Sequence, residues 1–152
     1  QLMLRDMTPA ANDDLTVGCD GRSILLAPMP GEQHTFGVLM VEEFFRHAGW
    51  ETTGWSITTK RELLAAVQDR HFAVIGLSVS HEAELHELAV LIPVIRKKSI
   101  NPDIRVMVGG PIFLADPGLV SGVGADATAN DGRHAVEQAE SLWRQVQAKH
   151  LA

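Results

Sequence analysis

Short hydrophobic runs alternate with amphipathic segments along most of the chain. The runs at 23–29, 50–55, 72–79, 104–108 and 125–129 have the length of buried strands. The segments at 36–47, 59–70, 82–98 and 116–121, and the one that follows Asp131, carry apolar residues at helical spacing. Gly49 marks a helix end, Pro93 predicts a kink, and Asp131 is a predicted N-cap. The pattern therefore predicts the order βαβαβαβαβα.

Regular alternation of strands and helices is typical of an α/β protein with a parallel sheet and helices on both faces. For five strands we expect the flavodoxin-like (Rossmann-like) order 2-1-3-4-5, in which a ligand lies beyond the carboxyl ends of strands one and three. The length of 152 residues fits one domain. Residues 1–22 lack periodicity and are predicted to be a mobile lead-in, and residues 23–149 form the predicted folded domain.

Composition narrows the classes of partner. The net charge is −6, and no basic cluster is visible beyond Arg96–Lys98 at a predicted helix end, so we expect protein or small-molecule partners and no direct contact with nucleic acid. No apolar run is long enough to span a membrane. The single cysteine, Cys19, excludes an internal disulfide, and without a visible signal peptide we expect a cytoplasmic protein. Because the first residue is Gln1, we expect a piece of a longer protein.

Three unusual loops follow strands one, three and four. The first spans residues 31–37 and contains Glu32 and His34, the second contains Ser78, Ser80 and His81, and the third begins at residues 109–110 with two glycines. In the expected strand order, these loops converge on one edge of the sheet. A carboxylate two residues from an imidazole fixes its tautomer, as at many metal ligands. The plainer alternatives are an exposed histidine, serines that cap helices, and a glycine turn.

Four familiar motifs do not fit. His81 and His86 are five residues apart, whereas a zinc-protease helix places its histidines four apart. Residues 77–81 lack the glycine-flanked elbow of α/β hydrolases. Residues 122–126 precede a strand, whereas a dinucleotide fingerprint follows one. The predicted third strand ends in serines and a histidine rather than in the acidic cluster of a response regulator.

Taken together, the three loops resemble the cobalamin-binding domain family. That family's pattern is Asp-x-His-x-x-Gly after strand one, Ser-x-Leu or Ser-x-Thr after strand three, and Gly-Gly after strand four. This chain has Glu-Gln-His-Thr-Phe-Gly at 32–37, Ser-Val-Ser at 78–80, Gly-Gly at 109–110, and the family's later Gly-Ala-Asp at 124–126. The resemblance covers about residues 23–148.

The resemblance implies a role for each matching residue. His34 would be the lower axial ligand of cobalt in place of the cobalamin's own base, with Glu32 as its hydrogen-bonding partner and Thr35 and Gly37 completing the motif. The displaced nucleotide tail would enter a slot between the sheet and the helices, lined by four residues: Ser78, Ser80, Gly109 and Gly110. Two departures, Glu32 for aspartate and Ser80 for the usual third residue, are ones we associate with gene regulators.

The residue sequence of the first motif, at 32–37, most resembles that of the bacterial antirepressors of photosynthesis genes and the light-sensing cobalamin regulators. This implies a non-enzymatic sensor that regulates transcription through light- or redox-dependent contact with a transcriptional repressor protein. Three alternatives stay open: a haem sensor with His34, His81 or Cys19 as axial ligand, the corrinoid-carrying subunit of a methyltransferase, and an interaction domain that has lost its tetrapyrrole.

Overall fold

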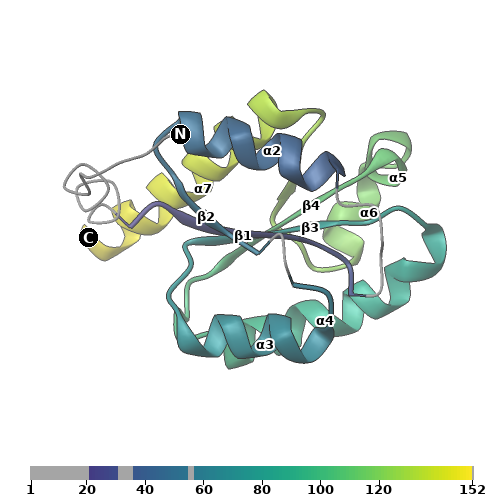
Figure 1. Ribbon diagram of the computed structural model, residues 1–152, viewed down its shortest axis with the longest axis horizontal. Coiled ribbons are helices and arrows are strands. Elements are labelled where there is room, and N and C mark those ends of the chain that lie inside the picture. Colours follow the sequence, from purple (N-terminus) through teal and green to yellow (C-terminus); the bar gives the residue numbers. More distant parts are fainter. Residues whose placement is uncertain (1–20, 31–35, 55–56, 152) are drawn as a thin grey trace.

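The chain folds into a three-layer α/β structure with a central five-stranded parallel sheet (Figure 1). The computed structural model describes residues 21–30, 36–54 and 57–151. The strand order is β2-β1-β3-β4-β5, which confirms the predicted flavodoxin-like topology. The strands are β1 (Ser23–Pro28), β2 (Glu51–Thr53), β3 (Val74–Ser78), β4 (Arg105–Gly109) and β5 (Ala127–Thr128).

Helices cover both faces of the sheet. In Figure 1, α2 (Phe36–His47) and α7 (Gly132–Leu151) lie on one face, and α3 (Lys60–Asp69) and α4 (Leu85–Lys98) lie on the other. A 3-10 turn, η1 (Glu82–Glu84), precedes α4, and two short helices, α5 (Pro111–Ala115) and α6 (Gly118–Gly122), follow β4. Within the described ranges, no helix is both long and apolar enough to cross a membrane.

Several boundaries differ from those predicted. β2 ends at Thr53 because Gly54 has a φ of 116°, and a Cβ there would lie 2.6 Å from the carbonyl oxygen of Leu26. The segment predicted as one helix at 82–98 begins with the 3-10 turn, and α4 continues through Pro93. The sequence did not predict α5, and α6 starts two residues later than expected. Of the predicted lead-in, residues 1–20 lie outside the described residues.

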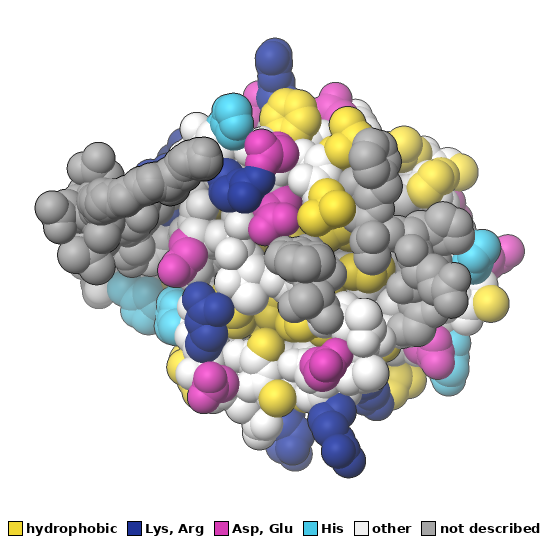
Figure 2. Space-filling view, in the orientation of Figure 1, with side chains coloured by type: hydrophobic (Ala, Val, Ile, Leu, Met, Phe, Trp, Pro, Cys, Tyr) yellow, Lys and Arg dark blue, Asp and Glu magenta, His cyan; other side chains and the backbone are white. Residues whose placement is uncertain are grey.

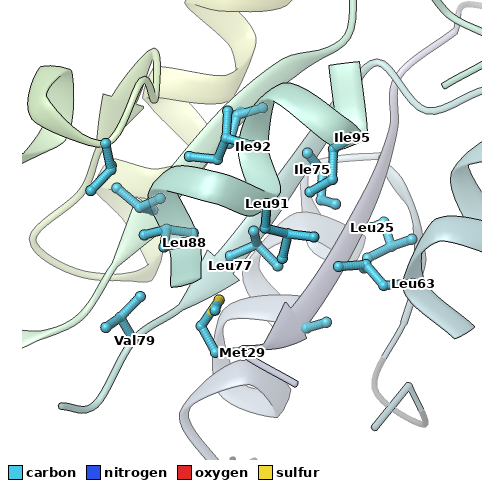
Figure 3. Packing of buried hydrophobic residues seen from close by; sticks show 14 of the residues in the cluster. Leu25, Met29, Leu63, Ile75, Leu77, Val79, Leu88, Leu91, Ile92 and Ile95 are labelled. Atoms are coloured by element: carbon cyan, nitrogen blue, oxygen red, sulfur yellow. The ribbon is translucent and has the colours of Figure 1, made fainter. Parts of the chain in front are cut away.

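The face of the sheet toward α3 and α4 is fully packed. Figure 3 shows Leu25, Ile75 and Leu77 of the sheet meeting a row of leucine and isoleucine side chains from α4. These side chains, Leu88, Leu91, Ile92 and Ile95, are at most 3% exposed. Burial of a side chain of this size contributes about 1.5–3 kcal/mol. This layer therefore provides the main hydrophobic core.

Capping interactions fix where two of the helices begin. Thr59 and Glu62 form a capping box at the start of α3, and the hydrogen bonds that the Glu62 carboxylate accepts from backbone N–H groups lower its pKa. At the start of α7, the Asp131 carboxylate accepts a hydrogen bond of 2.9 Å from the backbone N–H of His134. The predicted N-cap role of Asp131 is therefore confirmed.

Candidate functional site

The carboxyl ends of the three central strands lie side by side. Pro28 pairs with Ser78, and Ser78 pairs with Gly109, so β1, β3 and β4 end at the same level. Beyond this level, the backbone N–H of Met29 donates to the Ser78 carbonyl, and that of Val79 donates to the Gly109 carbonyl, each at 2.9 Å. The loops after these strands therefore leave the sheet at one common edge, as the sequence predicted.

A cavity opens at this edge, between the sheet and the helices α2 and α7. Its volume is about 240 Å³. It is lined by Ile24, Leu26, Ala27, Gly37, Val38, Val41, Phe45, Gly76, Leu77, Ser78, Met107, Val108, Gly109, Gly110, Ala129, Asn130, Asp131 and Ala135. We call this cavity the slot.

The slot exists because small residues replace large ones on this face of the sheet. Side chains alternate between the two faces of a strand, so Gly76 and Ser78 of β3 follow Val74 on the side toward α2 and α7. Gly109 follows Met107 on the same side of β4. At Gly76 a Cβ would lie 2.8 Å from the Leu26 side chain, which fills that space. The hydroxymethyl group of Ser78 and the hydrogen atom of Gly109 leave the carboxyl end open.

The glycines at this edge serve two different purposes. At Gly110, φ is 133° and a Cβ would lie 2.0 Å from the Val79 carbonyl oxygen, so the fold itself requires glycine. At Gly109 and Gly37, a Cβ would meet no atom of the described residues within 4 Å. Their missing side chains leave open space that a ligand can fill, which fits a large group approaching the backbone.

The structure brings together four of the predicted site residues. Gly37, Ser78, Gly109 and Gly110 all line the slot. Ser80 does not line it, because the chain has left the sheet there and its backbone N–H donates to the Glu84 carboxylate at 3.0 Å. Glu32, His34 and Thr35 lie outside the described residues. That these eight residues bind a cofactor, and that His34 holds its metal, stay predictions.

Sequence comparison decides which family the chain belongs to. Residues 22–140 match the model of the B12 binding domain. The chain is a member of this family. Membership of this family supports a corrinoid cofactor, and the slot at the carboxyl edge of the sheet is consistent with one. No curated protein sequence matches the chain.

Solved structures show the same fold. This chain superposes on a cobalamin-binding protein from Desulfitobacterium hafniense DCB-2 with a TM-score of 0.69 and 20% identity, over 79% of this chain and 58% of that one. It superposes on the monomethylamine corrinoid protein of Methanosarcina barkeri with a TM-score of 0.62 and 15% identity, over 83% of this chain and 61% of that one. This chain therefore spans about three fifths of each of these proteins.

Other residues singled out in the sequence have structural roles or lie away from the slot. In the Gly-Ala-Asp motif, Asp126 accepts hydrogen bonds from the Val106 N–H at 2.8 Å and the Arg96 guanidinium at 3.1 Å, which ties β4 and α4 to the start of β5. His81 and His86 are exposed and do not line the slot. Among the described residues, no group of three or more His, Cys, Asp or Glu side chains could hold a metal ion.

Sequence reasoning missed several residues that shape the slot. Gly76 lies in the middle of the clearest predicted strand, and a glycine inside a strand often marks a close approach of a ligand or another backbone, so it could have been found. Asn130 and Asp131 line the slot directly after β5. β5 has only two residues, so its sequence pattern is too short to predict where the strand ends and which residues reach the slot. The α2 and α7 residues Val38, Phe45 and Ala135 were assigned only to helical cores, because periodicity does not separate a packed face from a slot wall.

Proposed function

We propose that this B12 binding domain is a cobalamin sensor that regulates transcription by contact with a repressor protein. The slot carries the proposal: it is an apolar cavity whose edge is formed by Ser78 and Gly109, with open space where a Gly109 side chain would be. The nucleotide tail of the corrinoid would enter there. His34, which precedes α2 in the sequence, would ligate the cobalt, and the bound corrinoid would supply the response to light or redox state.

The chain's own residues would connect this site to a partner. Gly37, Val38, Val41 and Phe45 of α2 line the slot, whereas three other apolar side chains in the described part of α2 are partly exposed. Leu39, Met40 and Phe44 are 40%, 51% and 45% exposed, and Figure 2 shows hydrophobic side chains gathered over this helix. Exposed apolar groups of this kind often mark protein contacts. A corrinoid that shifts α2 would therefore alter the surface available to a repressor.

Ligand binding is tested with hydroxocobalamin. The protein is mixed with it in the dark and passed over a desalting column, and corrin absorbance is expected to elute with the protein. His34→Ala should lose the absorbance change of histidine ligation, whereas His47→Ala, an exposed histidine at the far end of α2, serves as the matched control. No corrin absorbance with the wild-type protein would refute the proposal. A Soret shift with hemin that requires His34 would support the haem alternative instead.

The proposed role in transcription needs a separate measurement. In a host that carries the gene, His34→Ala is expected to change the dark-to-light ratio of photosynthesis-gene transcripts, whereas His47→Ala is not. Equal ratios in the wild type and the His34→Ala strain would refute a role in this regulation.

The second function we consider is a corrinoid-carrying subunit of a methyltransferase. The observation that favours it is the shared fold with the Methanosarcina barkeri monomethylamine corrinoid protein. In such a subunit the cofactor carries the methyl group, and the protein positions it. Transfer of methyl from the methylated corrinoid on this protein to a thiol acceptor, in the presence of extracts of the same host, would support this function over the sensor.

A further inference from the structure

The walls of the slot are apolar except at the edge of the sheet. Its deep part is formed by Leu26, Val38, Val41, Phe45, Met107 and Ala135. The backbone N–H and C=O groups of β1, β3 and β4 in this region are paired within the sheet. Beyond the first turn of each helix, those of α2 and α7 are paired along the helix. A group that lies against Leu26, Phe45 and Met107 therefore finds no hydrogen-bond partner among these side chains.

Polar groups are collected at the mouth of the slot. Ser78 ends β3, and Asn130 and Asp131 follow β5, so all three lie at the carboxyl edge of the sheet. The Asp131 carboxylate accepts the N–H of His134, whereas the side chains of Ser78 and Asn130 make no hydrogen bond within the part of the chain that the structure describes. Two polar side chains at the mouth are thus available to a polar ligand segment.

The size of the slot suits a fused aromatic ring. An apolar cavity of about 150 Å³ holds a benzene molecule. The slot, with about 240 Å³, has room for a bicyclic ring. Benzimidazole and purine bases are both bicyclic and of similar size, so volume alone does not separate them. The chemistry of the slot walls distinguishes the two kinds of base.

We propose that the slot selects corrinoids by the base of the nucleotide tail, favouring 5,6-dimethylbenzimidazole over adenine. This inference rests on the proposed function. The two methyl groups of dimethylbenzimidazole gain from burial against Leu26, Phe45 and Met107. Adenine brings an amine and additional ring nitrogens, which would lose their water without finding partners among these side chains. Because hydrophobic sites reject an added polar group only moderately, the expected preference is about 10- to 100-fold in Kd.

Three corrinoids test this preference on the complete chain. Kd is measured by absorbance titration with hydroxocobalamin, with the hydroxo form of the adenine-tailed analogue, and with cobinamide, which has no nucleotide tail. The expected order is cobalamin tightest, with both other corrinoids at least about 10-fold weaker. Equal Kd values for the two tailed corrinoids, or for cobalamin and cobinamide, would overturn the proposal. Binding of none of the three would refute the proposed function itself.

A substitution in the deep wall tests the cause of the preference. Met107→Gln places an amide among the apolar side chains, and the ratio of the adenine-tailed Kd to the cobalamin Kd is expected to fall several-fold. Met40→Gln is the matched control, because Met40 of α2 is 51% exposed, and its ratio should equal that of the wild type. Val41→Thr, at a half-buried wall position, is a second and gentler test. An unchanged ratio in both wall variants would contradict the assigned cause.

Discussion

A valine at position 109 should separate ligand binding from folding. Gly109 ends β4, its φ is not in the left-handed region, and within the part of the chain that the structure describes a Cβ there meets nothing within 4 Å. Glycine inside a strand or helix costs about 0.5–1 kcal/mol relative to alanine, and β-branched residues favour strands. Gly109→Val is therefore expected to leave the free energy of unfolding unchanged or to raise it by about 1 kcal/mol.

The same valine would occupy the slot. Forcing additional atoms into a filled site costs about 1–3 kcal/mol, which corresponds to roughly a 5- to 150-fold increase in Kd. We expect this increase for hydroxocobalamin, measured by absorbance titration, with the unfolding free energy taken from urea denaturation of the same preparation. Gly122→Val should leave the Kd unchanged, because Gly122 does not line the slot and a Cβ there likewise meets no described atom within 4 Å.

Gly110→Ala provides the opposite result. Its Cβ would approach the Val79 carbonyl oxygen to 2.0 Å at a φ of 133°, so the unfolding free energy should fall by at least about 1–3 kcal/mol. If Gly109→Val is folded and binds hydroxocobalamin as tightly as the wild type, the slot does not receive the ligand. If Gly109→Val is as unstable as Gly110→Ala, the distinction between the two glycines is wrong.

Three further predictions concern stability. Asp131→Ala removes the N-cap of α7 and should lower the unfolding free energy by about 0.5–2 kcal/mol in urea, whereas Asp131→Asn should recover most of it. Gly132→Ala would place a Cβ 2.3 Å from the ring of Phe44 and should cost about 1–3 kcal/mol, and a double-mutant cycle with Phe44→Ala should return part of that loss. Hydrogen bonds from Lys149 and His150, near the end of α7, lower the pKa of Asp103 below its ordinary 3.8. The stability that the ionised Asp103 contributes is fully present above pH 3.8 and is lost as the pH falls through the lower folded-state pKa. When Tm is measured from pH 5 to 2, it should therefore fall less steeply in Asp103→Asn than in the wild type.

Much of the fold could be predicted because buried parallel strands are continuous apolar runs. β3 is a clear example, since residues 74–77 are all buried and form one apolar run. Only its ends were misplaced: the predicted strand was two residues too long at its start and one residue too long at its end. Short elements escaped because their patterns are brief. The five residues of α5 start at Pro111 after the left-handed Gly110, and a turn would have the same sequence.

The site could be predicted only where its residues follow strand ends. Ser78 and Gly109 belong to such ends, and their register places them side by side. The depth and polarity of the slot depend on which α2 and α7 side chains face it, and on how far the helices stand from the sheet. Helical periodicity identifies Val38 and Phe45 as inward-facing but contains no information about the space between them and Met107.

The hollow at the carboxyl end of the sheet also bears on how such domains change over time. It depends on a few small side chains, chiefly Ser78 and Gly109, whereas the packed face toward α3 and α4 uses other residues. A single replacement such as Gly109→Val could close the hollow without touching that face. The opening at the carboxyl edge and the packing of the opposite face therefore rest on different residues, and one or two substitutions at the edge would fill the slot while leaving that packed face intact.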